Sequence, residues 1–482
     1  MYTMNSSEAV TAIFDIGKTN KKFFLYDQNF SIVDQHQTVI EQKEDACGDL
    51  YEDAEVLKSW MESRLAQPLN SEKFDLEAVN VSAYGATLAH LNKQGELVIP
   101  IEDYLKQHPE NLFHRFLEEG GNREPGDFIR RTASPPLGML NSGFQLYRLK
   151  YEQPEVYHKI AWSLHLPQYA IYLLTGNVYS EPTSIGCHTM LWDFEEQQYH
   201  CWLEKEEMIQ KLPAVHSVTT TQVSRCMRKV LNTGIGIHDS SAALAPYIYL
   251  LEDEFVLLST GTWSISLNPF SHEPLTGSEL ERDCLNYLDI FGRSVKASRF
   301  FLGGEHDHQT QKLDEYFGPM DINEIEPDVE LIRVLLHNRD PNRKLRLEVS
   351  NRSGPFQSEE TEEWHIDQFS SYEEAYHQLM LDLIAIQVES LQLALGSSNI
   401  EQIIVTGGFA QNNLYNRLLA TFLPNKKIYK ANIPHASALG AVLVVNNDKL
   451  DASKLERIKP LLKMELSEPF EELKDFSYQW TQ

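Results

Sequence analysis

The sequence is poor in cysteine and in basic residues. Its 482 residues include five cysteines, far apart and never in Cys-x-x-Cys spacing. An odd number of scattered cysteines argues against a disulfide framework and favours free thiols in a reducing compartment. Lys and Arg number 42 against 70 Asp and Glu, a formal net charge of −28. Such a charge repels nucleic acid and anionic membranes, so the expected partner is a small molecule.

Long apolar runs are also missing from the sequence. No run approaches the roughly 20 apolar residues that span a bilayer, and the N-terminal residues lack the apolar core of a signal peptide. We therefore expect a cytoplasmic protein. A chain of 482 residues exceeds what one hydrophobic core usually supports, so we expect two domains.

What the chain does contain is one pattern that occurs twice. Residues 11–26 and residues 255–267 each read as an apolar strand, a turn of small residues and a returning strand. The two copies lie about half the chain apart. A strand, a turn and a returning strand predict a hairpin whose turn amides and hydroxyls can hold phosphate. Two such hairpins facing each other across a cleft would form a nucleotide clamp.

The first turn carries charge. Asp15 ends an apolar strand and Gly17 follows two residues later, with Lys18, Lys21 and Lys22 beside the turn. A carboxylate at this place can organise Mg²⁺ through waters, and a glycine lets the backbone approach a phosphate. The alternative for this copy alone is an ordinary hairpin turn.

The second turn carries hydroxyls, in Thr260-Gly261-Thr262. Hydroxyls on both sides of a glycine suit a phosphate contact, although such a turn is a weak signal by itself. Further along, Gly407-Gly408 follows a predicted strand at 403–406 and precedes Asn412. Bare backbone and an amide could seat a purine ring there, and a plain turn is the alternative.

Asp239 is the strongest candidate for chemistry. It follows Gly234, Gly236 and His238 at a predicted junction between a strand and a helix, where a carboxylate can point into a cleft. Asp is also a favoured helix N-cap. The local sequence favours the cap, because two serines follow.

Alternating strand and helix patterns along the chain predict two α/β domains. Residues 102–136, rich in charge, Gly and Pro, read as a surface insertion. The metal-like cluster Glu305-His306-Asp307-His308 has no partner pair at ligand spacing, so we expect a solvated loop. The helices that we expect span 54–65, 141–151, 154–174, 240–251, 372–395, 413–422 and 436–444.

Taken together, these motifs resemble the FGGY family of carbohydrate kinases, in the actin-like ATPase superfamily. The resemblance covers nearly the whole chain. The segments that carry it are Asp15–Lys22, Leu140–Gly143, Leu174–Gly176, Gly236–Asp239, Ser259–Trp263, Gly407–Gly408 with Asn412, and Ala438–Ala441.

The resemblance implies an α/β fold of two actin-like (ribonuclease H-like) domains with an ATP and sugar cleft between them. Residues 1–230 would hold the first phosphate loop and the sugar site. Residues 231–482 would hold the catalytic base, the second phosphate loop, the adenosine site and a helical tail. By the same resemblance Asp239 is the catalytic base, Asp15 and Asp239 lie at Mg²⁺, and Gly85 and His238 contact the sugar. The implied ATP-binding residues are Asp15, Gly17, Lys18, Thr19, Asn20, Lys22, Thr260, Gly261, Thr262, Gly407, Gly408 and Asn412.

The implied activity is ATP-dependent transfer of the γ-phosphoryl group to a hydroxyl of a ketose. A His directly before the base resembles the kinases of 6-deoxyketohexoses, such as rhamnulose or fuculose, more than the xylulose or glycerol kinases. A xylulose, ribulose or polyol kinase is the alternative within the family. An actin-like chaperone or filament ATPase, or a sugar-sensing regulator without catalysis, are alternatives of another class. A homodimer is compatible with the sequence.

The chain departs from the family pattern at three places. Residues 101–104 supply two acids where the family often shows an Asp and an Arg. Lys18 replaces a small residue, and His435 stands where a Glu is common. The first departure leaves the sugar open, and the other two are expected to adjust ATP binding.

Overall fold

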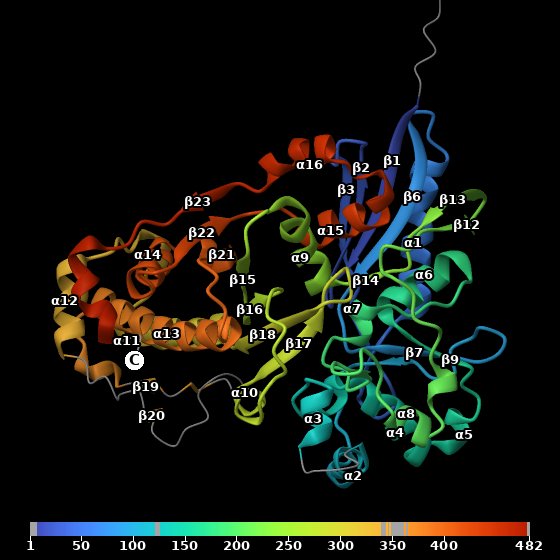
Figure 1. The fold of residues 1–482 in the computed structure, drawn as a ribbon, viewed down its shortest axis with the longest axis horizontal. Coiled ribbons are helices and arrows are strands. Elements are labelled where there is room, and N and C mark those ends of the chain that lie inside the picture. Colours follow the sequence, from blue (N-terminus) through green and yellow to red (C-terminus); the bar gives the residue numbers. More distant parts are fainter. Residues whose placement is uncertain are drawn as a thin grey trace, which may run out of the picture. The chain divides into compact units, whose positions relative to one another are not determined.

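The computed structural model describes residues 7–120, 126–338, 344–345, 347–348, 361–362 and 365–479. Its contacts divide the chain into two compact units. Unit 1 comprises Met1–Leu251, Asn286–Ser294 and Pro434–Pro460, and unit 2 comprises Glu252–Leu285, Val295–Ile433 and Leu461–Gln482. Both units combine sheets and helices, so the predicted two-domain α/β class is confirmed (Figure 1). These units group residues by their contacts and do not test a boundary along the chain. The domain boundary near residue 231 therefore stays a prediction.

The main sheet of unit 1 brings several strand ends to one edge. Its order is β12–β13–β6–β1–β2–β3, and β14 also pairs with β6. β1 runs parallel to β6, and β6 runs parallel to β14, with Ile16 and His238 both opposite Ala83. The segments that follow these three strands therefore leave the sheet at the same edge. The strands are β1 (Glu8–Ile16), β2 (Asn20–Tyr26), β3 (Ile32–Val39), β6 (Phe74–Ala83), β12 (Gln222–Cys226), β13 (Lys229–Thr233) and β14 (Ile237–His238).

Helices α1 (Ala54–Leu69), α6 (Leu166–Thr175), α9 (Asp239–Leu250) and α15 (Ala436–Val445) pack on this sheet or on one another. The small-residue segment Ala438–Ala441 lies in α15. A Cβ on Gly440 would lie 1.8 Å from the Ala242 carbonyl oxygen of α9. Only glycine allows α15 to approach α9 this closely, which explains why small residues gather there.

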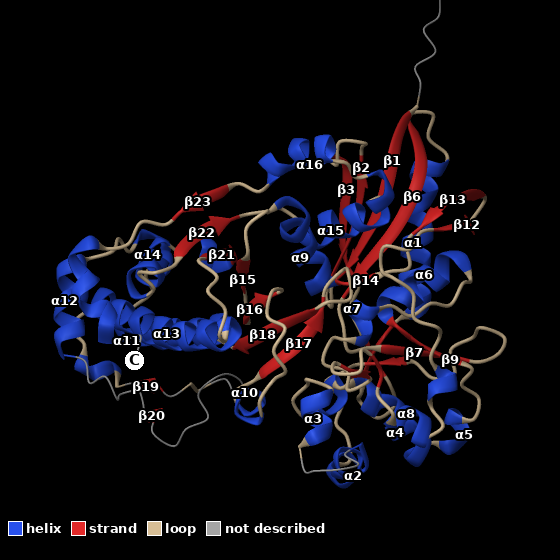
Figure 2. Ribbon diagram, in the orientation of Figure 1, coloured by secondary structure: helices blue, strands red, loops and turns tan. Residues whose placement is uncertain are grey.

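The predicted surface insertion at 102–136 is wrong for its described residues. They form the end of β8 (Ile101–Glu102), α2 (Glu110–Gly120) and α3 (Asp127–Arg131) (Figure 2), while residues 121–125 lie outside the described residues. Phe113, Phe116 and Phe128 are buried in one core with Phe144 and Trp202. The aromatic side chains at 113 and 116 share one face of α2, so the segment has a core of its own.

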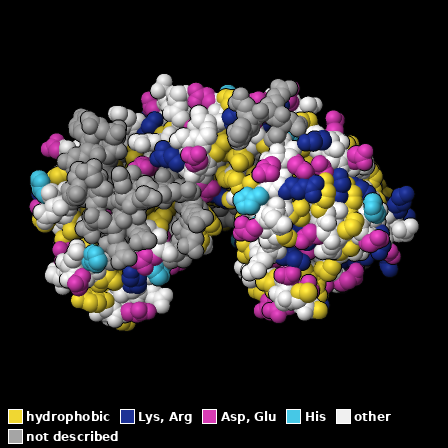
Figure 3. All heavy atoms as spheres, turned by 90° about the horizontal axis from the view of Figure 1, so that it is seen from below, with side chains coloured by type: hydrophobic (Ala, Val, Ile, Leu, Met, Phe, Trp, Pro, Cys, Tyr) yellow, Lys and Arg dark blue, Asp and Glu magenta, His cyan; other side chains and the backbone are white. Residues whose placement is uncertain are grey.

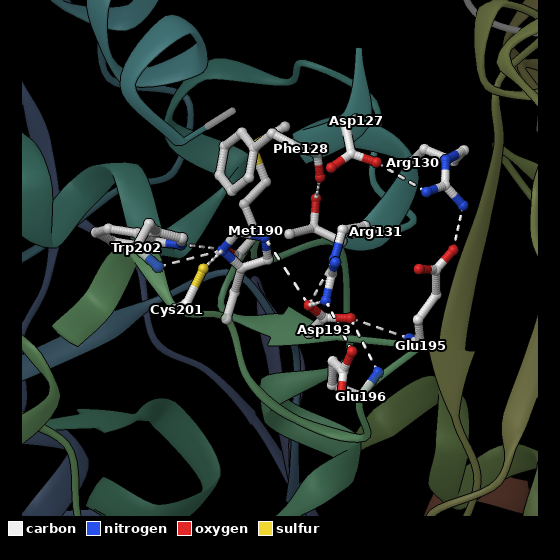
Figure 4. Close-up of polar contacts among 12 residues, drawn as sticks. Asp127, Phe128, Arg130, Arg131, Met190, Asp193, Glu195, Glu196, Cys201 and Trp202 are labelled. Atoms are coloured by element: carbon white, nitrogen blue, oxygen red, sulfur yellow. Dashed lines mark hydrogen bonds and ion pairs between the residues drawn. The ribbon is translucent and has the colours of Figure 1, made fainter. Parts of the chain in front are cut away.

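Charged residues fasten this small core. The Arg131 guanidinium donates to the Asp193 carboxylate with an Nε to Oδ2 distance of 2.8 Å, and Asp193 also accepts the backbone N–H of Glu195 at 3.0 Å. Trp202 Nε1 donates to the Met190 carbonyl at 2.8 Å. Figure 4 shows Arg131 of α3 pointing to Asp193, at the end of β10 (Trp192–Asp193), with Glu195 and Glu196 on the turn that follows. The charged residues that suggested a loop therefore stabilise a folded segment.

The single helix expected at 154–174 is three elements: α5 (Pro154–Tyr157), β9 (Trp162–His165) and α6. Pro167 lies in the first turn of α6, a position that proline favours, whereas a helix interior rejects it. β9 pairs antiparallel with β7 (Leu88–Leu91). The end of α6 matches the prediction, because Gly176 adopts a left-handed conformation with φ of 73°.

The sheet of unit 2 repeats the hairpin arrangement. Its order is β17–β18–β16–β15–β21–β22–β23, with β15 antiparallel to β16 and parallel to β21. In unit 1, β1 likewise pairs with β2 and β6. Both predicted hairpins are therefore present. The strands are β15 (Phe255–Thr260), β16 (Ser264–Asn268), β17 (Cys284–Leu288), β18 (Ser294–Phe300), β21 (Gln402–Gly407), β22 (Lys427–Ala431) and β23 (Met464–Leu466).

The central helix of unit 2 is α13 (Tyr372–Leu395), packed with α11 (Leu302–Phe317), α12 (Val329–Asn338) and α14 (Asn413–Phe422). The sequence reading overlooked that α13 is long and apolar enough to cross a membrane. Of its apolar window, 78% is buried inside the structure, as in a core helix of a globular domain. Ser371 caps α13 by accepting the Glu374 N–H at 3.2 Å.

The remaining elements are short. They are β4 (Lys43–Glu44), β5 (Leu50–Glu52), η1 (Gly138–Leu140), α4 (Ser142–Glu152), α7 (Pro182–Ile185), β11 (Gln198–Tyr199), α8 (Trp202–Lys205), η2 (Ile209–Lys211), α10 (Gly277–Glu281), η3 (Ile322–Glu324), β19 (Lys344–Leu345), β20 (Thr361–Glu362), η4 (Ile366–Gln368), η5 (Gly408–Gln411), η6 (Asn447–Lys449), α16 (Ala452–Ile458), η7 (Lys459–Leu461) and η8 (Glu471–Gln479).

Candidate active site

The first turn lies between β1 and β2. The Gly17 N–H donates to the Asn20 carbonyl at 3.0 Å and closes the turn, and Thr19 and Asn20 are exposed. A Cβ on Gly17 would lie 3.0 Å from the same carbonyl oxygen. Asp15 lies opposite Lys22 across the hairpin. The turn therefore presents exposed backbone and polar side chains next to a carboxylate and an ammonium group.

Asp15 is surrounded by ionisable and polar groups. Burial raises the pKa of its carboxyl, a hydrogen bond with Ser437 lowers it, and the charge of Asp239 raises it again. Asp15 and Asp239 are therefore close enough to repel each other. Sequence reasoning missed Ser437, which belongs to α15 and lies 422 positions away from Asp15.

Asp239 is the first residue of α9 and lies at the edge where β14 ends. The N-cap position is occupied by His238, whose side chain makes no capping bond, so the reading of Asp239 as the helix cap is wrong. The Asp239 side chain keeps 36% of its exposure. Burial raises the pKa of the carboxyl to about 6, although hydrogen bonds with Ser240 lower it. A base with this pKa is ionised at neutral pH and is still basic enough to take a proton.

His238 lies beside Asp239 with its ring fixed on two sides. His238 Nε2 lies 3.2 Å from Cys187 Sγ and 3.2 Å from Asp239 Oδ1. The ring stacks on Tyr287 at a centroid distance of 5.8 Å. Burial lowers the pKa of His238 to about 3, so the imidazole is neutral at pH 7. Within the described residues, its Nδ1 atom is buried without a hydrogen-bond partner.

Gly85 faces the same imidazole. A Cβ on Gly85 would lie 2.9 Å from both His238 Nε2 and Cys187 Sγ. The two residues that the sequence assigned to the sugar therefore lie together in unit 1. Sequence reasoning missed Cys187 and Tyr287, because each reaches His238 from a distant segment and carries no local motif.

Two of the three lysines near the first turn are held by acids. Lys18 Nζ lies 2.9 Å from Asp103 Oδ2. Lys21 is fully buried and lies 3.4 Å from Glu52. Lys22 is half-buried on β2 and lowers the pKa of Asp15 by its charge. These lysines were expected to offset the net negative charge of the chain next to a bound phosphate. In the structure, two of them pair with acids of the same unit instead.

The second turn presents Gly261, Thr262 and Trp263 to solvent. Thr260 lies on the strand and differs from them. Its hydroxyl donates to the Thr406 carbonyl at 2.5 Å and accepts the Phe409 N–H at 3.1 Å. The Thr260 hydroxyl therefore joins β15 to β21 and η5, while the Thr262 hydroxyl stays at the exposed turn.

Gly407 and Gly408 follow β21. Gly407 has a φ of 85°, and a Cβ there would lie 1.7 Å from the Thr260 carbonyl oxygen, whereas nothing lies within 4 Å of a Cβ on Gly408. Asn412 caps α14 through its Oδ1, which accepts the Tyr415 N–H at 2.9 Å. Its Nδ2 donates to the Tyr376 hydroxyl at 3.0 Å.

Residues 305–308 are helical, so the solvated loop expected there is wrong. They lie in α11, and Glu305 and His306 are buried. The Glu305 carboxylate accepts from Gln309 Nε2 at 2.7 Å, and His306 lies edge-on to Phe409. The described residues contain no group of three or more His, Cys, Asp or Glu side chains that could hold a metal ion.

The structure thus gathers the predicted residues in two places. Asp15, Gly17, Lys18, Thr19, Asn20, Lys22, Gly85, His238 and Asp239 lie in unit 1, and Thr260, Gly261, Thr262, Gly407, Gly408 and Asn412 lie in unit 2. On the face drawn in Figure 3, basic and acidic side chains are interspersed among the residues shown in colour.

Comparison with protein families matches both halves of the chain. Residues 10–239 match the N-terminal domain of the FGGY family of carbohydrate kinases. Residues 252–453 match the C-terminal domain of FGGY carbohydrate kinases.

Curated relatives include a rhamnulokinase of Yersinia pestis (strain Pestoides F). It is 24% identical over 248 residues, which cover 48% of this chain and 48% of the relative. A rhamnulokinase of Yersinia pseudotuberculosis matches with the same figures. The match thus spans about half the length of these relatives.

Solved structures share the fold along almost the whole chain. A carbohydrate kinase from Novosphingobium aromaticivorans superposes with a TM-score of 0.79 at 25% identity, covering 98% of both chains. A xylulose kinase from Lactobacillus acidophilus gives 0.75 at 14% identity, covering 98% of this chain and 96% of that one. Glycerol kinase from Plasmodium falciparum with ADP gives 0.75 at 16%, covering 98% and 97%. The last two show the fold alone.

Proposed function

Because the chain belongs to the FGGY family of carbohydrate kinases, we propose that it transfers the γ-phosphoryl group of ATP to a hydroxyl of a ketose. One observation carries this proposal. Asp239, with a pKa of about 6, lies beside the neutral imidazole of His238 in the unit that also contains Asp15. A base beside the attacking hydroxyl and carboxylates that can hold Mg²⁺ recur in phosphoryl-transfer sites, and a neutral imidazole can hydrogen-bond a sugar hydroxyl.

In the proposed reaction Asp239 accepts the proton of the attacking hydroxyl. The hydroxyl oxygen forms a bond to the γ-phosphorus as the bond from that phosphorus to the β-γ bridging oxygen breaks, and ADP leaves. A positioned base contributes roughly 10²–10⁴-fold to such a step. Asp239 suits this role because its carboxylate is ionised above a pH of about 6.

Asp15 and Asp239 are the residues that would hold Mg²⁺. The observation that supports them is electrostatic: the charge of Asp239 raises the pKa of Asp15, and a divalent cation between carboxylates relieves such repulsion. Oxygen ligands are those that Mg²⁺ prefers. A bound Mg²⁺ would neutralise charge on the phosphate oxygens.

For the nucleotide we propose two sets of residues. Gly17, Thr19, Asn20 and Lys22 of unit 1 offer exposed backbone, polar groups and one ammonium group to the phosphates. In unit 2, Gly261 and Thr262 would bind phosphate and Gly407, Gly408 and Asn412 would bind adenosine. Thr260 fits a supporting role better, because its hydroxyl is engaged within unit 2.

For the sugar we propose a 6-deoxyketohexose such as rhamnulose or fuculose. The support is His238, whose buried Nδ1 has no hydrogen-bond partner in the described part of the chain and can bind a sugar hydroxyl. The curated rhamnulokinases agree with this choice. A xylulose, ribulose or polyol kinase is the alternative within the family.

The proposed enzyme works in the cytoplasm, in line with its five cysteines, none of which forms a disulfide in the described part of the chain. A homodimer stays an untested prediction from the sequence.

The test is a panel of sugars assayed for ATP-dependent ADP release in a coupled assay. The panel begins with rhamnulose and fuculose and continues with xylulose, ribulose and glycerol. ³¹P NMR of the product then identifies the phosphorylated hydroxyl, and the D239N variant is the matched control. ADP release at the same rate without sugar would contradict the proposal and favour an actin-like ATPase. Sugar binding without ADP release would favour a regulator.

A further inference from the structure

Two departures from the family pattern contact each other. Lys18 stands where a small residue is common, and Asp103 belongs to the segment 101–104 that lacks the arginine. Lys18 Nζ lies 2.9 Å from Asp103 Oδ2 and 3.2 Å from Oδ1, although 85 positions separate the two residues. An ion pair therefore joins the first turn to the segment 101–104.

Asp103 is held so that it needs this cation. Its side chain is only 2% exposed, whereas that of Lys18 is 29% exposed. Asp103 Oδ1 also accepts the Leu105 N–H at 2.6 Å, which fixes the carboxylate against its own loop. A buried carboxylate without a paired cation is strongly unfavourable. If Lys18 moved from Asp103 to a phosphate, the Asp103 carboxylate would remain buried without its cation, which is unfavourable.

A second contact strengthens the first. Lys18 Nζ lies 4.2 Å from the centroid of the Tyr104 ring, within the range of a cation–π interaction. The Tyr104 hydroxyl has its pKa raised to about 12 by burial and by nearby carboxylates, among them Asp103 and Asp239. The segment that Lys18 grips is thus close enough to Asp239 for their charges to interact.

The same turn is anchored to the Gly85 segment by a parallel route. Lys21 Nζ donates to the Lys18 carbonyl at 2.7 Å and pairs with Glu52. Glu52 in turn accepts from the Tyr84 hydroxyl at 2.7 Å, and the Tyr84 ring lies edge-on to Tyr104 at 6.0 Å. Tyr84 directly precedes Gly85, which faces His238.

We propose that Lys18 is a positioning residue that ties the first phosphate turn to the sugar-side segments at Asp103, Tyr104 and Gly85. The position of Lys18 in the turn predicts a ligand of the ATP phosphates. Under this proposal Lys18 does not bind them. This inference rests on the proposed kinase function. Its consequence is that breaking the ion pair disturbs sugar use and turnover while the affinity for ATP is kept.

The test compares K18M, K18R, D103N and the double variant K18M/D103N with the active sugar from the panel. We expect K18M and D103N each to raise KM for the sugar or lower kcat about tenfold, and KM for ATP to stay within about twofold. Contacting residues couple, so the double variant should be no worse than the poorer single variant. K18R keeps the charge and should recover most of the activity.

Two further variants serve as controls. K22M removes the lysine proposed for the phosphates and should raise KM for ATP. K229M removes an exposed ion pair with Asp75 and should change neither KM. If K18M raises KM for ATP like K22M, with the sugar KM unchanged and an additive effect of D103N, Lys18 is a phosphate ligand and the inference is wrong.

Failure of the proposed function gives a different result. In that case the wild-type chain releases no ADP with any sugar of the panel. Calorimetric binding of a non-hydrolysable ATP analogue to the wild-type, K18M and K22M chains then still reads the role of Lys18. Loss of binding in K22M alone supports the positioning role, and equal loss in K18M and K22M overturns it.

Discussion

The turn between β1 and β2 and the turn between β15 and β16 both connect antiparallel strands and are held in different ways. The first is surrounded by charged side chains, in the pairs Lys18–Asp103 and Lys21–Glu52 and in Asp15 opposite Lys22. The second is held by close backbone contacts: a Cβ on Gly407 would lie 1.7 Å from the Thr260 carbonyl oxygen, and one on Gly303 would lie 2.2 Å from the Gly261 carbonyl oxygen.

The two turns therefore differ in the groups that they can offer to a reaction. The unit that contains the first turn also supplies Asp15 and Asp239, so its charged groups are those that can act on a proton or a cation. The second turn offers amides and one exposed hydroxyl, which can place a phosphate without taking part in proton transfer. Changes of charge should therefore matter most in unit 1, and changes of backbone space most in unit 2.

The largest effect is expected for D239N. Loss of the carboxylate removes the proposed base, so kcat should fall by roughly 10²–10⁴-fold. The coupled ADP-release assay with the active sugar measures this, and binding of the ATP analogue should be kept. A D239N variant with full turnover would show that Asp239 is not the base and that the charged groups of unit 1 do not set the rate of the chemical step.

The next largest effect is expected for K21M. Lys21 is 0% exposed and Glu52 is 3% exposed, and breaking a buried ion pair from one side costs about 3–5 kcal/mol. Urea denaturation of the whole chain should show this loss. The double variant K21M/E52Q removes both charges and should regain part of the stability. Equal losses in the single and double variants would mean that the charge pair does not hold the first turn.

For unit 2 the matching change is G407A. The methyl group would collide with the Thr260 carbonyl, and the φ of 85° is unfavourable for alanine. Overpacking costs about 1–3 kcal/mol and a left-handed conformation about 1–2 kcal/mol, so we expect a loss of roughly 2–5 kcal/mol. G408A, where a Cβ meets open space, is the matched control and should unfold like the wild type.

Acid should weaken unit 1 through His90. Burial lowers the pKa of this imidazole to about 4, below the 6.5 of an unfolded chain. The unfolded state therefore binds more protons between these values, and stability falls as the pH drops from about 6.5 to about 4. At pH 5 the loss amounts to about 2 kcal/mol. Urea denaturation measures how far the free energy of unfolding falls from pH 7 to pH 5. The fall should be smaller in H90Q than in the wild type, and an equal fall would exclude His90 as the cause.

The sequence predicted the elements that depend on local signals. Gly176 and Gly396 end helices, Ser371 begins one, and Asp15 and Asp239 lie at strand ends as expected. It failed where distant segments decide the outcome. The core around Phe116 and Phe144 needs contacts that no local pattern shows, and the pairing of β9 with β7 divided an apparent helix.

Candidate residues show the same limit. The residue types at Lys18 and Thr260 suit phosphate, yet their side chains already have partners in the fold, Asp103 and the Thr406 carbonyl. Conversely, Ser437, Cys187 and Tyr287 contact the candidate site without belonging to any motif. Residue type and spacing identify what a side chain can do, and only the tertiary contacts decide whether that capacity is still available.

The smallest effect sharpens this point within the second turn. Thr260 and Thr262 are alike in sequence, but the Thr260 hydroxyl joins β15 to β21 and that of Thr262 is exposed. T260V should lower stability by about 1 kcal/mol, the net contribution of a hydrogen bond, and leave KM for ATP unchanged. T262V should keep the stability and raise KM for ATP. Thermal denaturation and initial rates separate the two variants, and the opposite assignment would mean that the hydroxyl inside the fold, rather than the one at the turn, reaches the phosphate.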